Sequence, residues 1–420
     1  MWRPQLHNPT VDRRFFRLSL LATLLVVACG SSQTASPSRV TTSARPTLAS
    51  GLPSTDNFLA DVWCSSSTVC TAVGHVARAF DDGGPETRTL IEENTGAGWR
   101  IVPSPNDDAS VGSKLRAITC INAGNCIAVG DSANRASIPK TLIEQDNGSG
   151  WTIIPSPNPS VIGGFARLAG VACATSTHCV AVGSYESDGG NFHTLIEENH
   201  GNGWQVVPSP NPGADSDDRL NAVACASQSL CVAVGAHHSG EHDLPLVEQN
   251  SGAGWTIVAV PGSGGLEGVA CPGPAACVAT GGEESVSGTS LFIDHLVEDM
   301  TNGVWTTVSV PGLAGTLHRV SCSSATYCIA VSSWGTSSAG GSPIIAERIN
   351  NVWAAGAQAP VANELLDLVG VACPSARSCI AVGDRILGKD VDYMRPRATF
   401  ICRAHNPRMD GPDQPQRLRF

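Results

Sequence analysis

The sequence has few charged and few aromatic side chains for its length of 420 residues. Charged residues make up 15% of the chain and aromatic residues 5%. Coiled coils and large helical bundles need many Glu, Lys, Leu and Arg, so this composition argues against both. Positive side chains are outnumbered as well: 26 Lys and Arg against 37 Asp and Glu give a formal net charge of −11. Nucleic acid binding needs a basic face, and we therefore expect no nucleic acid partner.

Long apolar runs and common catalytic motifs are also missing. After residue 28 no stretch is long and apolar enough to predict a transmembrane helix. The sequence contains neither a G-x-S-x-G elbow nor an H-E-x-x-H motif, and its only tyrosines are Tyr185, Tyr327 and Tyr393. These absences argue against the familiar serine hydrolases and zinc proteases. We predict no cofactor.

Turn-forming residues and cysteine are abundant instead. The chain has 44 Gly, 27 Pro and 16 Cys. Short strands joined by turns account for the glycine and proline. Sixteen cysteines are more than an ordinary cytosolic enzyme uses. No segment after residue 30 has a sustained helical period, so we predict an all-β protein.

The first 28 residues have the three-part form of a bacterial export signal. Four arginines precede the apolar run 18–28, which is too short to span a bilayer stably. The run continues into Cys29 as Val-Val-Ala-Cys, which resembles the lipobox of bacterial lipoproteins. The resemblance implies acylation of the Cys29 thiol, anchoring at the membrane outside the cytoplasm, and a flexible Ser/Thr/Pro-rich tether over residues 29–55. An ordinary signal peptide that ends in cysteine is the alternative.

A repeat of about fifty residues is the strongest pattern in the sequence. Each unit reads L-x-x-V-x-C-x5-C-x-A-V-G, then a variable loop, then T-L-I-E-x-N-x-G-x-G-W-x-x-V-P. Successive first cysteines are 56, 53, 52, 46, 51 and 51 residues apart. Seven units of this length indicate a propeller or another repeat array.

Each unit contains four runs that are typical of strands. In the second unit these short runs, rich in β-branched residues, are 115–120, 126–130, 141–144 and 151–154. Four antiparallel strands, repeated seven times, predict a seven-bladed β-propeller over residues 56–405, followed by an irregular tail over 406–420. A β-solenoid is the alternative, although its coils are usually shorter than fifty residues.

One segment of the repeat resembles a known motif. The sequence Asp146-Asn-Gly-Ser-Gly-Trp151 resembles the Asp-box of sialidase-type propellers, a turn that joins the third and fourth strands of a blade. Asparagine variants begin at Asn94, Asn199 and Asn250, and the fifth and sixth units keep only the tryptophan. The chain is therefore similar to exported bacterial propellers with sialidase-like (BNR) repeats. This implies the fold and not the activity, because the family's arginine-bearing opening motif is absent.

The cysteines fall into seven pairs with five residues between the partners. Each pair flanks the turn between the first two strands of a unit, where a hairpin brings two Cβ atoms within disulfide reach. An oxidising compartment favours the bond, and we predict seven bridges: Cys64–Cys70, Cys120–Cys126, Cys173–Cys179, Cys225–Cys231, Cys271–Cys277, Cys322–Cys328 and Cys373–Cys379.

The seventh unit departs from the pattern. Cys402 has no partner and is aligned here with glutamates such as Glu144 and Glu197 of the other units. The W-x-x-V-P strand is missing, so residues 36–50 or the tail 416–420 would have to supply the fourth strand, unless this end of the chain is degraded.

The long loops on the face opposite the repeated turns vary from unit to unit, so we expect the ligand there. Basic side chains near the start of the innermost strands would converge at the mouth of the channel and hold a carboxylate or sulfate. These are Lys114, Arg116, Arg167, Arg219, His318 and Arg319. The simpler alternative is a solvated rim in which they pair with Asp215, Asp217 and Asp218.

A histidine-rich loop is the second candidate site. It contains His237, His238, Glu241, His242 and Asp243, whose side chains are suited to zinc or copper. The spacing follows no ligand pattern, which is equally typical of a polar loop.

The sequence favours a lipid-anchored, monomeric binding or scaffolding module without catalytic activity. Its ligand would be a glycan, a cell-wall fragment or another exported protein. The alternative is a glycan-active hydrolase or lyase whose site lies in the long loops. The glutamate pairs Glu92/Glu93 and Glu197/Glu198 recur with the third strand, which indicates a structural role and not an acid/base pair.

Overall fold

The structure is a computed structural model, and every regular element among its described residues is a β-strand. No helix within the described residues has the length and apolar character needed to cross a membrane. The export signal, Cys29, the tether up to residue 54 and the tail 406–420 lie outside the described residues, as do Glu241 and Asp215. Thr55, predicted as the last residue of the tether, begins the first strand. The structure describes residues 55–78, 86–106, 110–134, 138–159, 164–213, 216–240, 242–287, 290–313, 315–332, 345–356, 364–376, 378–387 and 397–402.

The strands repeat in seven successive groups. The first strands are β1 (Thr55–Cys64), β5 (Ser110–Asn122), β9 (Ala166–Thr175), β13 (Asp217–Ser227), β17 (Gly265–Gly273), β21 (Leu317–Ser324) and β25 (Glu364–Ser375). The second strands are β2 (Val69–Arg78), β6 (Asn125–Asn134), β10 (His178–Glu186), β14 (Leu230–Ser239), β18 (Ala276–Ser287), β22 (Tyr327–Ser332) and β26 (Ser378–Leu387). The third strands are β3 (Glu86–Thr95), β7 (Pro139–Asp146), β11 (Phe192–Asn199), β15 (His242–Asn250), β19 (Ser290–Thr301), β23 (Ile345–Ile349) and β27 (Arg397–Cys402). The fourth strands are β4 (Trp99–Val102), β8 (Trp151–Ile154), β12 (Trp204–Val207), β16 (Trp255–Ile257), β20 (Val304–Thr307) and β24 (Val352–Ala355).

Within each group the strands pair antiparallel in chain order, which gives sheets 1 to 7. Sheets 1 to 6 have four strands each, and sheet 7 has the three described strands β25, β26 and β27. A single parallel pair, Thr87 with Gly112, joins sheets 1 and 2. The all-β class and the four strands expected in the second unit, β5 to β8, are confirmed. The segments considered for the missing strand, 36–50 and 416–420, lie outside the described residues.

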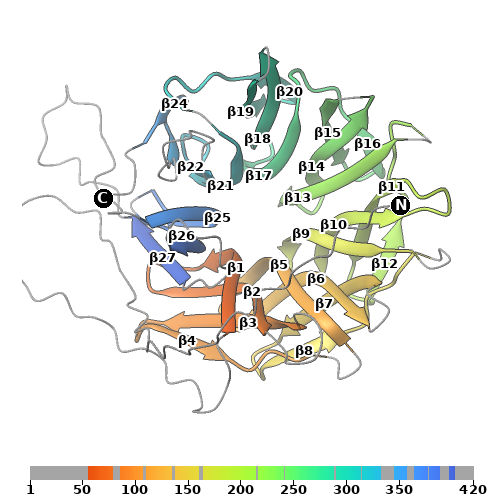
Figure 1. The fold of residues 1–420 in the computed structure, drawn as a ribbon, viewed down its shortest axis with the longest axis vertical. Coiled ribbons are helices and arrows are strands. Elements are labelled where there is room, and N and C mark those ends of the chain that lie inside the picture. Colours follow the sequence, from red (N-terminus) through yellow and green to blue (C-terminus); the bar gives the residue numbers. More distant parts are fainter. Residues whose placement is uncertain are drawn as a thin grey trace, which may run out of the picture.

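The sheets are arranged around a common centre, with the first strands innermost (Figure 1). Apolar clusters fill the seams between consecutive sheets. In the last seam Leu59 and Val62 of sheet 1 pack with Ile380 and Val382 of sheet 7. The two ends of the described chain therefore meet, because the last sheet packs against the first.

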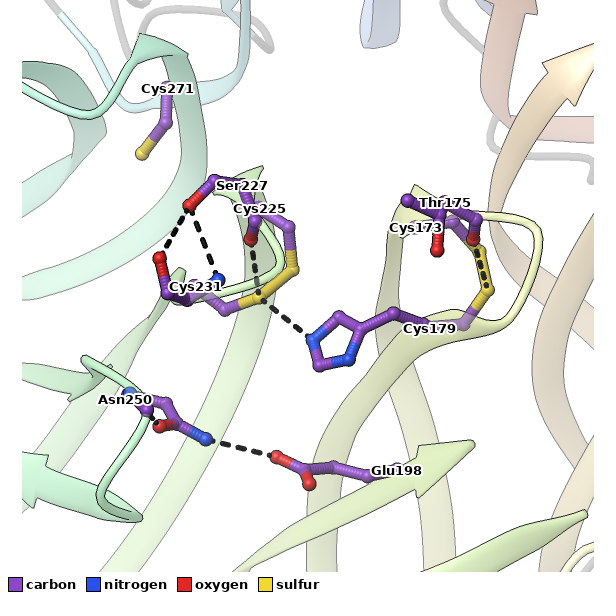
Figure 2. Close-up of a disulfide and its surroundings, with 12 residues drawn as sticks. Cys173, Thr175, Cys179, Glu198, Cys225, Ser227, Cys231, Asn250 and Cys271 are labelled. Atoms are coloured by element: carbon purple, nitrogen blue, oxygen red, sulfur yellow. Dashed lines mark hydrogen bonds between the residues drawn. A yellow bond between two sulfur atoms is a disulfide. The ribbon is translucent and has the colours of Figure 1, made fainter. Parts of the chain in front are cut away.

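All seven predicted disulfides are present, one in each sheet. Figure 2 shows the bridges of sheets 3 and 4 at the turns between the first and second strands. The register of sheet 7 corrects the alignment of its third strand. Phe400, and not Cys402, faces Ala381, the position that Glu197 takes opposite Ala181 in sheet 3. Cys402 lies where sheet 3 has Asn199.

The turn before each tryptophan takes one of two forms. In sheet 2, Asp146 Oδ1 accepts hydrogen bonds from the amides of Gly148 (2.9 Å) and Gly150 (3.0 Å), and both glycines have positive φ. In sheets 5 and 6 a two-residue turn with Asn302 (φ 52°) or Asn350 (φ 50°) replaces it. Asparagine tolerates this left-handed conformation, so the strands stay paired although the longer motif is lost.

A repeated polar contact crosses three of the seams. Ser104 Oγ, after the fourth strand of sheet 1, lies 2.6 Å from Thr89 Oγ1 and 3.0 Å from Glu144 Oε2 of sheet 2. The same arrangement recurs at the next two seams, from Ser156 to Glu197 and from Ser209 to Glu248. These glutamates are fully buried. Burial raises the pKa of each to about 8, and the serine and threonine hydroxyls oppose the shift.

Candidate ligand-binding site

Each first strand has a β-bulge directly after the leucine of the L-x-x-V motif. In sheet 3 the pairing steps from Leu168–Gly183 to Gly170–Val182, which leaves Ala169 as the extra residue. Gly183 ends the A-V-G motif, and a Cβ there would lie 1.9 Å from the carbonyl oxygen of Arg167. The glycine thus permits the close approach at the bulge, and such bulges re-aim neighbouring side chains.

A cavity of about 420 Å³ lies between the first strands. All seven sheets contribute to its wall, mostly with Ala, Gly, Val and Cys from the segments between each bulge and the first cysteine. Asp61 and Arg319 are the charged residues of this wall. Asp61 accepts hydrogen bonds from the amides of Val62 (2.9 Å) and Ile118 (3.0 Å), which ties sheet 1 to sheet 2. Burial raises the pKa of Asp61, and the charge of Arg319 opposes this.

The predicted basic residues lie mainly outside this cavity. Lys114, Arg167 and Arg219 precede the bulges, and only Arg319 of the six lines the cavity. The structure therefore divides the channel into a small-residue cavity toward the cysteine turns and a charged mouth toward the long loops. The sequence did not predict the cavity.

Three consecutive sheets each place an arginine at the charged mouth. Arg116 Nε lies 2.5 Å from Asp131 Oδ1 in sheet 2, and Arg219 Nη2 lies 2.6 Å from Asp243 Oδ2 in sheet 4. Arg167 stands between them in sheet 3, and no described carboxylate forms an ion pair with it. Its guanidinium carbon lies 5.7 Å from the centroid of the Phe165 ring. Burial and then the like charge of Arg116 lower the pKa of Arg167, while the charges of Asp131 and Glu267 oppose the shift.

Glu267 completes this cluster and was not among the residues predicted from the sequence. Glu267 is the bulge residue of sheet 5, as Arg116 is of sheet 2. Burial raises the pKa of Glu267, while Arg319, Arg219 and Arg167 lower it. Comparing the seven units at the residue after the leucine would have revealed it, because that position also holds Arg116 and His318.

The remaining predicted basic residues have different roles. Burial, with Lys114 and Arg116 as further causes, lowers the pKa of His75 to about 4. Burial and then Arg319 lower the pKa of His318 to about 4, so His318 is neutral at pH 7 and adds no positive charge. Arg319 Nη1 donates to the backbone oxygen of Glu267 and so links sheet 6 to sheet 5.

The carboxylates nearest these arginines are not the ones named as partners in the sequence analysis. Asp217 instead accepts a hydrogen bond from the amide of Phe192 (2.8 Å), and Asp218 Oδ1 lies 2.6 Å from His237 Nδ1. Asp131 and Asp243 are the partners of Arg116 and Arg219.

The histidines of the predicted metal loop bind separate carboxylates. His237 pairs with Asp218, and His238 Nδ1 lies 2.9 Å from Asp243 Oδ1. Adjacent residues of a strand point to opposite faces, which explains the separation. In the part of the chain that the structure describes, no group of three or more His, Cys, Asp or Glu side chains is placed to hold a metal ion.

No family model matches the sequence, and no curated protein matches it. Solved structures match in fold. The BP39L lectin from Burkholderia pseudomallei has a TM-score of 0.51 at 11% identity, with 82% of this chain and 99% of the lectin covered. In fold, this chain is similar to β-propellers.

Two further structures have lower scores. The β-propeller domain of the Trilobed protease from Pyrococcus furiosus has a TM-score of 0.49 at 10% identity, over 82% of this chain and 95% of that domain. Sqt1 from Chaetomium thermophilum has a TM-score of 0.47 at 12% identity, over 81% and 86%. At these identities the similarity concerns architecture and not ligands.

Proposed function

We propose that this protein is an exported, lipid-anchored seven-bladed β-propeller that binds an acidic ligand at its charged mouth without transforming it. The proposal rests on the surroundings of Arg167. This arginine is a half-buried cation between two arginines that already have carboxylate partners, and no described carboxylate forms an ion pair with it. A ligand carboxylate or sulfate would supply the missing partner through two parallel hydrogen bonds.

The ligand class follows from this chemistry. Acidic glycans and cell-wall fragments carry carboxylate or sulfate groups and occur outside the cytoplasm, where the predicted signal would send the protein. The similarity in fold to a lectin makes glycans a sensible first choice. A protein partner would reach the same mouth through an Asp or Glu side chain or a C-terminal carboxylate.

Thermal unfolding of the purified protein with sialyl, uronate and sulfated oligosaccharides tests the proposal. A ligand at about one hundred times its Kd adds about 2.7 kcal/mol to stability. We expect Arg167→Gln to abolish the shift. Arg100→Gln is the matched control, because Arg100 is exposed and pairs with Glu93 away from the mouth. An acidic sugar that stabilises the Arg167→Gln variant as well as the wild type would contradict the proposal.

A glycan-active hydrolase or lyase is the second candidate, and Glu267 is the reason to keep it. Burial raises the pKa of the Glu267 carboxyl although three arginines oppose the shift, and a carboxyl with a raised pKa can act as a general acid. Turnover of an acidic glycan by the wild type, lost in Glu267→Gln, would establish this function. Binding without turnover in either protein supports the binding module.

The lipid anchor has its own test. Acylation of Cys29 should send the exported protein into the detergent phase of a Triton X-114 separation, and Cys29→Ser should move it to the aqueous phase. Wild-type protein found only in the aqueous phase would overturn the anchor, and the binding function would be unaffected.

A further inference from the structure

Two histidines of sheet 3 meet on the face that carries the cysteine turns. His178 begins β10 directly after the turn of the Cys173–Cys179 bridge, and His200 follows β11 in the turn before Trp204. Their Nδ1 atoms lie 3.1 Å apart. The two residues are 22 positions apart in sequence, and the pairing of β10 with β11 brings both turns to the same edge of the sheet.

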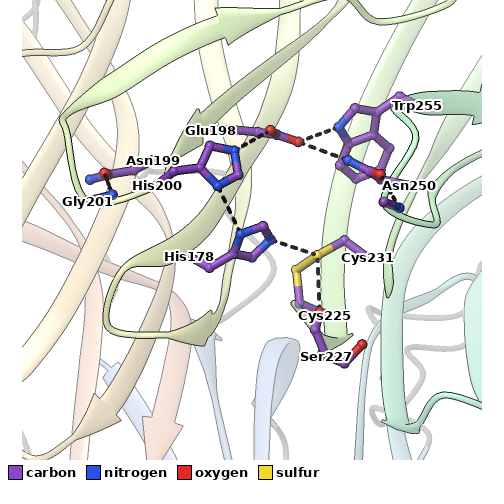
Figure 3. A network of polar contacts seen from close by, with 11 residues as sticks. His178, Glu198, Asn199, His200, Gly201, Cys225, Ser227, Cys231, Asn250 and Trp255 are labelled. Atoms are coloured by element: carbon purple, nitrogen blue, oxygen red, sulfur yellow. Dashed lines mark hydrogen bonds and ion pairs between the residues drawn. A yellow bond between two sulfur atoms is a disulfide. The ribbon is translucent and has the colours of Figure 1, made fainter. Parts of the chain in front are cut away.

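A carboxylate holds the second of these rings in place (Figure 3). Glu198 Oε2 lies 2.9 Å from His200 Nε2. The other carboxylate oxygen, Oε1, accepts hydrogen bonds from Trp255 Nε1 (2.7 Å) and Asn250 Nδ2 (3.2 Å) of sheet 4. Because a carboxylate only accepts, the hydrogen of neutral His200 resides on Nε2. The lone pair of His200 Nδ1 is then directed toward His178.

We propose that His178 and His200 form a binding site for a late first-row divalent metal ion, with Cu²⁺ preferred over Zn²⁺. Both nitrogens can reach one ion at about 2.0–2.1 Å, because two such bonds at an angle of about 100° span the observed separation. The contact of Glu198 with the outer nitrogen of His200 is the arrangement that orients metal-bound histidines.

The proton balance is compatible with this site. Neutral His178 moves its single hydrogen from Nδ1 to Nε2 when Nδ1 binds the ion, so no proton is released. Nε2 lies 4.0 Å from the disulfide sulfur of Cys231, a weak acceptor. Among the described residues no third His, Cys, Asp or Glu completes the set, so water would fill the other positions.

Calorimetric titration of the full-length protein with CuCl₂, ZnCl₂ and MgCl₂ tests the site. We expect one equivalent of Cu²⁺, weaker binding of Zn²⁺ and none of Mg²⁺. His178→Ala and His200→Ala should each weaken Cu²⁺ binding by at least about tenfold, since even outer contacts to a ligand contribute 10–100-fold. His193→Ala is the matched control, because His193 lies on the same strand as Glu198 near Tyr185.

Wild-type protein gives a second readout that does not depend on a variant folding. Zn²⁺ should protect His178 and His200 from diethylpyrocarbonate, as seen by peptide mass spectrometry, and leave His238 reactive. Unchanged Cu²⁺ binding in both alanine variants would overturn the proposal. Protection confined to His237 and His238 would overturn it too and would assign the ion to the histidine loop.

Discussion

At the scale of single residues, the glycine that ends A-V-G determines how the innermost strand is built. Its missing Cβ leaves room for a carbonyl oxygen that the bulge pushes inward, as at Gly183 against Arg167. Gly130 and Gly235 meet the backbone of Lys114 and Arg219 in the same way. The backbone positions of three mouth residues therefore depend on glycines in the neighbouring strand.

Gly183→Ala should lower the free energy of unfolding by about 1–3 kcal/mol, because the new Cβ forces strand β9 away from β10. Urea unfolding followed by tryptophan fluorescence measures the change. Gly189→Ala in the loop of the same sheet is the control and should stay within about 0.5 kcal/mol, since its nearest neighbour is a side-chain oxygen at 3.7 Å. Sheet 6 has Ser332 at the equivalent position. A Gly183→Ala protein as stable as the wild type would show that the bulge can relax.

The sequence revealed some of these residues and not others, for physical reasons. The cysteine pairs were evident because both partners sit in one turn, where spacing alone decides the geometry. Arg116, Arg167 and Arg219 were found because they recur near the same point of the unit. Asp131 and Asp243 were missed as ion-pair partners, since each comes from another strand and depends on register. His178 and His200 were missed because two separate turns bring them together.

At the scale of strands and sheets, each sheet has its own covalent bridge and polar contacts to its neighbours. The bridge closes only the turn between the first and second strands. Contacts between sheets come instead from apolar clusters and from serine–glutamate pairs such as Ser156–Glu197. The repeat predicted the strands, but it could not predict the serine–glutamate contacts, because the partners lie about forty residues apart in different units.

Replacing both Cys173 and Cys179 with alanine should cost about 2 kcal/mol in stability, the chain-entropy value for so short a loop. The sheet should still form, because its strand pairing and seam contacts remain. Guanidinium unfolding measures the loss, and mass spectrometry of the non-reduced wild type should find seven local links. A much larger loss would mean that this turn also holds sheet 3 against sheet 4.

The buried glutamates predict that stability falls as pH rises. Below their ordinary pKa of 4.5 they are protonated in the folded and the unfolded chain, so they have no effect. Between 4.5 and about 8 only the unfolded chain ionises them, and each step in pH favours unfolding. The number of available hydrogens supports a protonated Glu144. Thr89 donates its only hydroxyl hydrogen to the carbonyl oxygen of Pro105, and Ser104 donates its only one to Thr89. The contact between Ser104 and Glu144 is then completed by a hydrogen on the Glu144 carboxyl.

A variant with Glu144→Gln, Glu197→Gln and Glu248→Gln should flatten this dependence. We compare the free energy of unfolding of the variant with that of the wild type at each pH. From pH 5 to pH 8 this difference should shift in favour of the variant by at least about 1.4 kcal/mol for each glutamate replaced, the value of one pKa unit. Thermal unfolding from pH 5 to pH 9 provides the comparison. Parallel curves for the two proteins would show that these carboxyls ionise in the folded protein.

At the scale of the whole molecule, small residues after the bulges set how tightly the innermost strands pack. A Cβ on Gly170 would lie 2.8 Å from Ala222 Cα of sheet 4, and one on Gly370 would lie 2.9 Å from Asp61 Cα of sheet 1. The contact between the last and first sheets is therefore as close as one in the middle of the chain.

Gly370→Ala and Gly170→Ala should lower the urea midpoint by similar amounts, each in one transition, because both open a seam of the same ring. Tryptophan fluorescence and circular dichroism should give coincident curves. If Gly370→Ala leaves the urea midpoint unchanged while Gly170→Ala lowers it, sheet 7 does not close the ring in solution.

The position of the disulfides has a consequence for how such a chain can grow. Each bridge begins and ends within one hairpin, and none ties one sheet to another. A duplicated gene segment that encodes one sheet therefore carries both halves of its own bond, and a deletion removes both. The number of sheets could change by whole units without leaving an unpaired cysteine. If the chain is exported as proposed, each hairpin can oxidise as it emerges, without waiting for a distant partner.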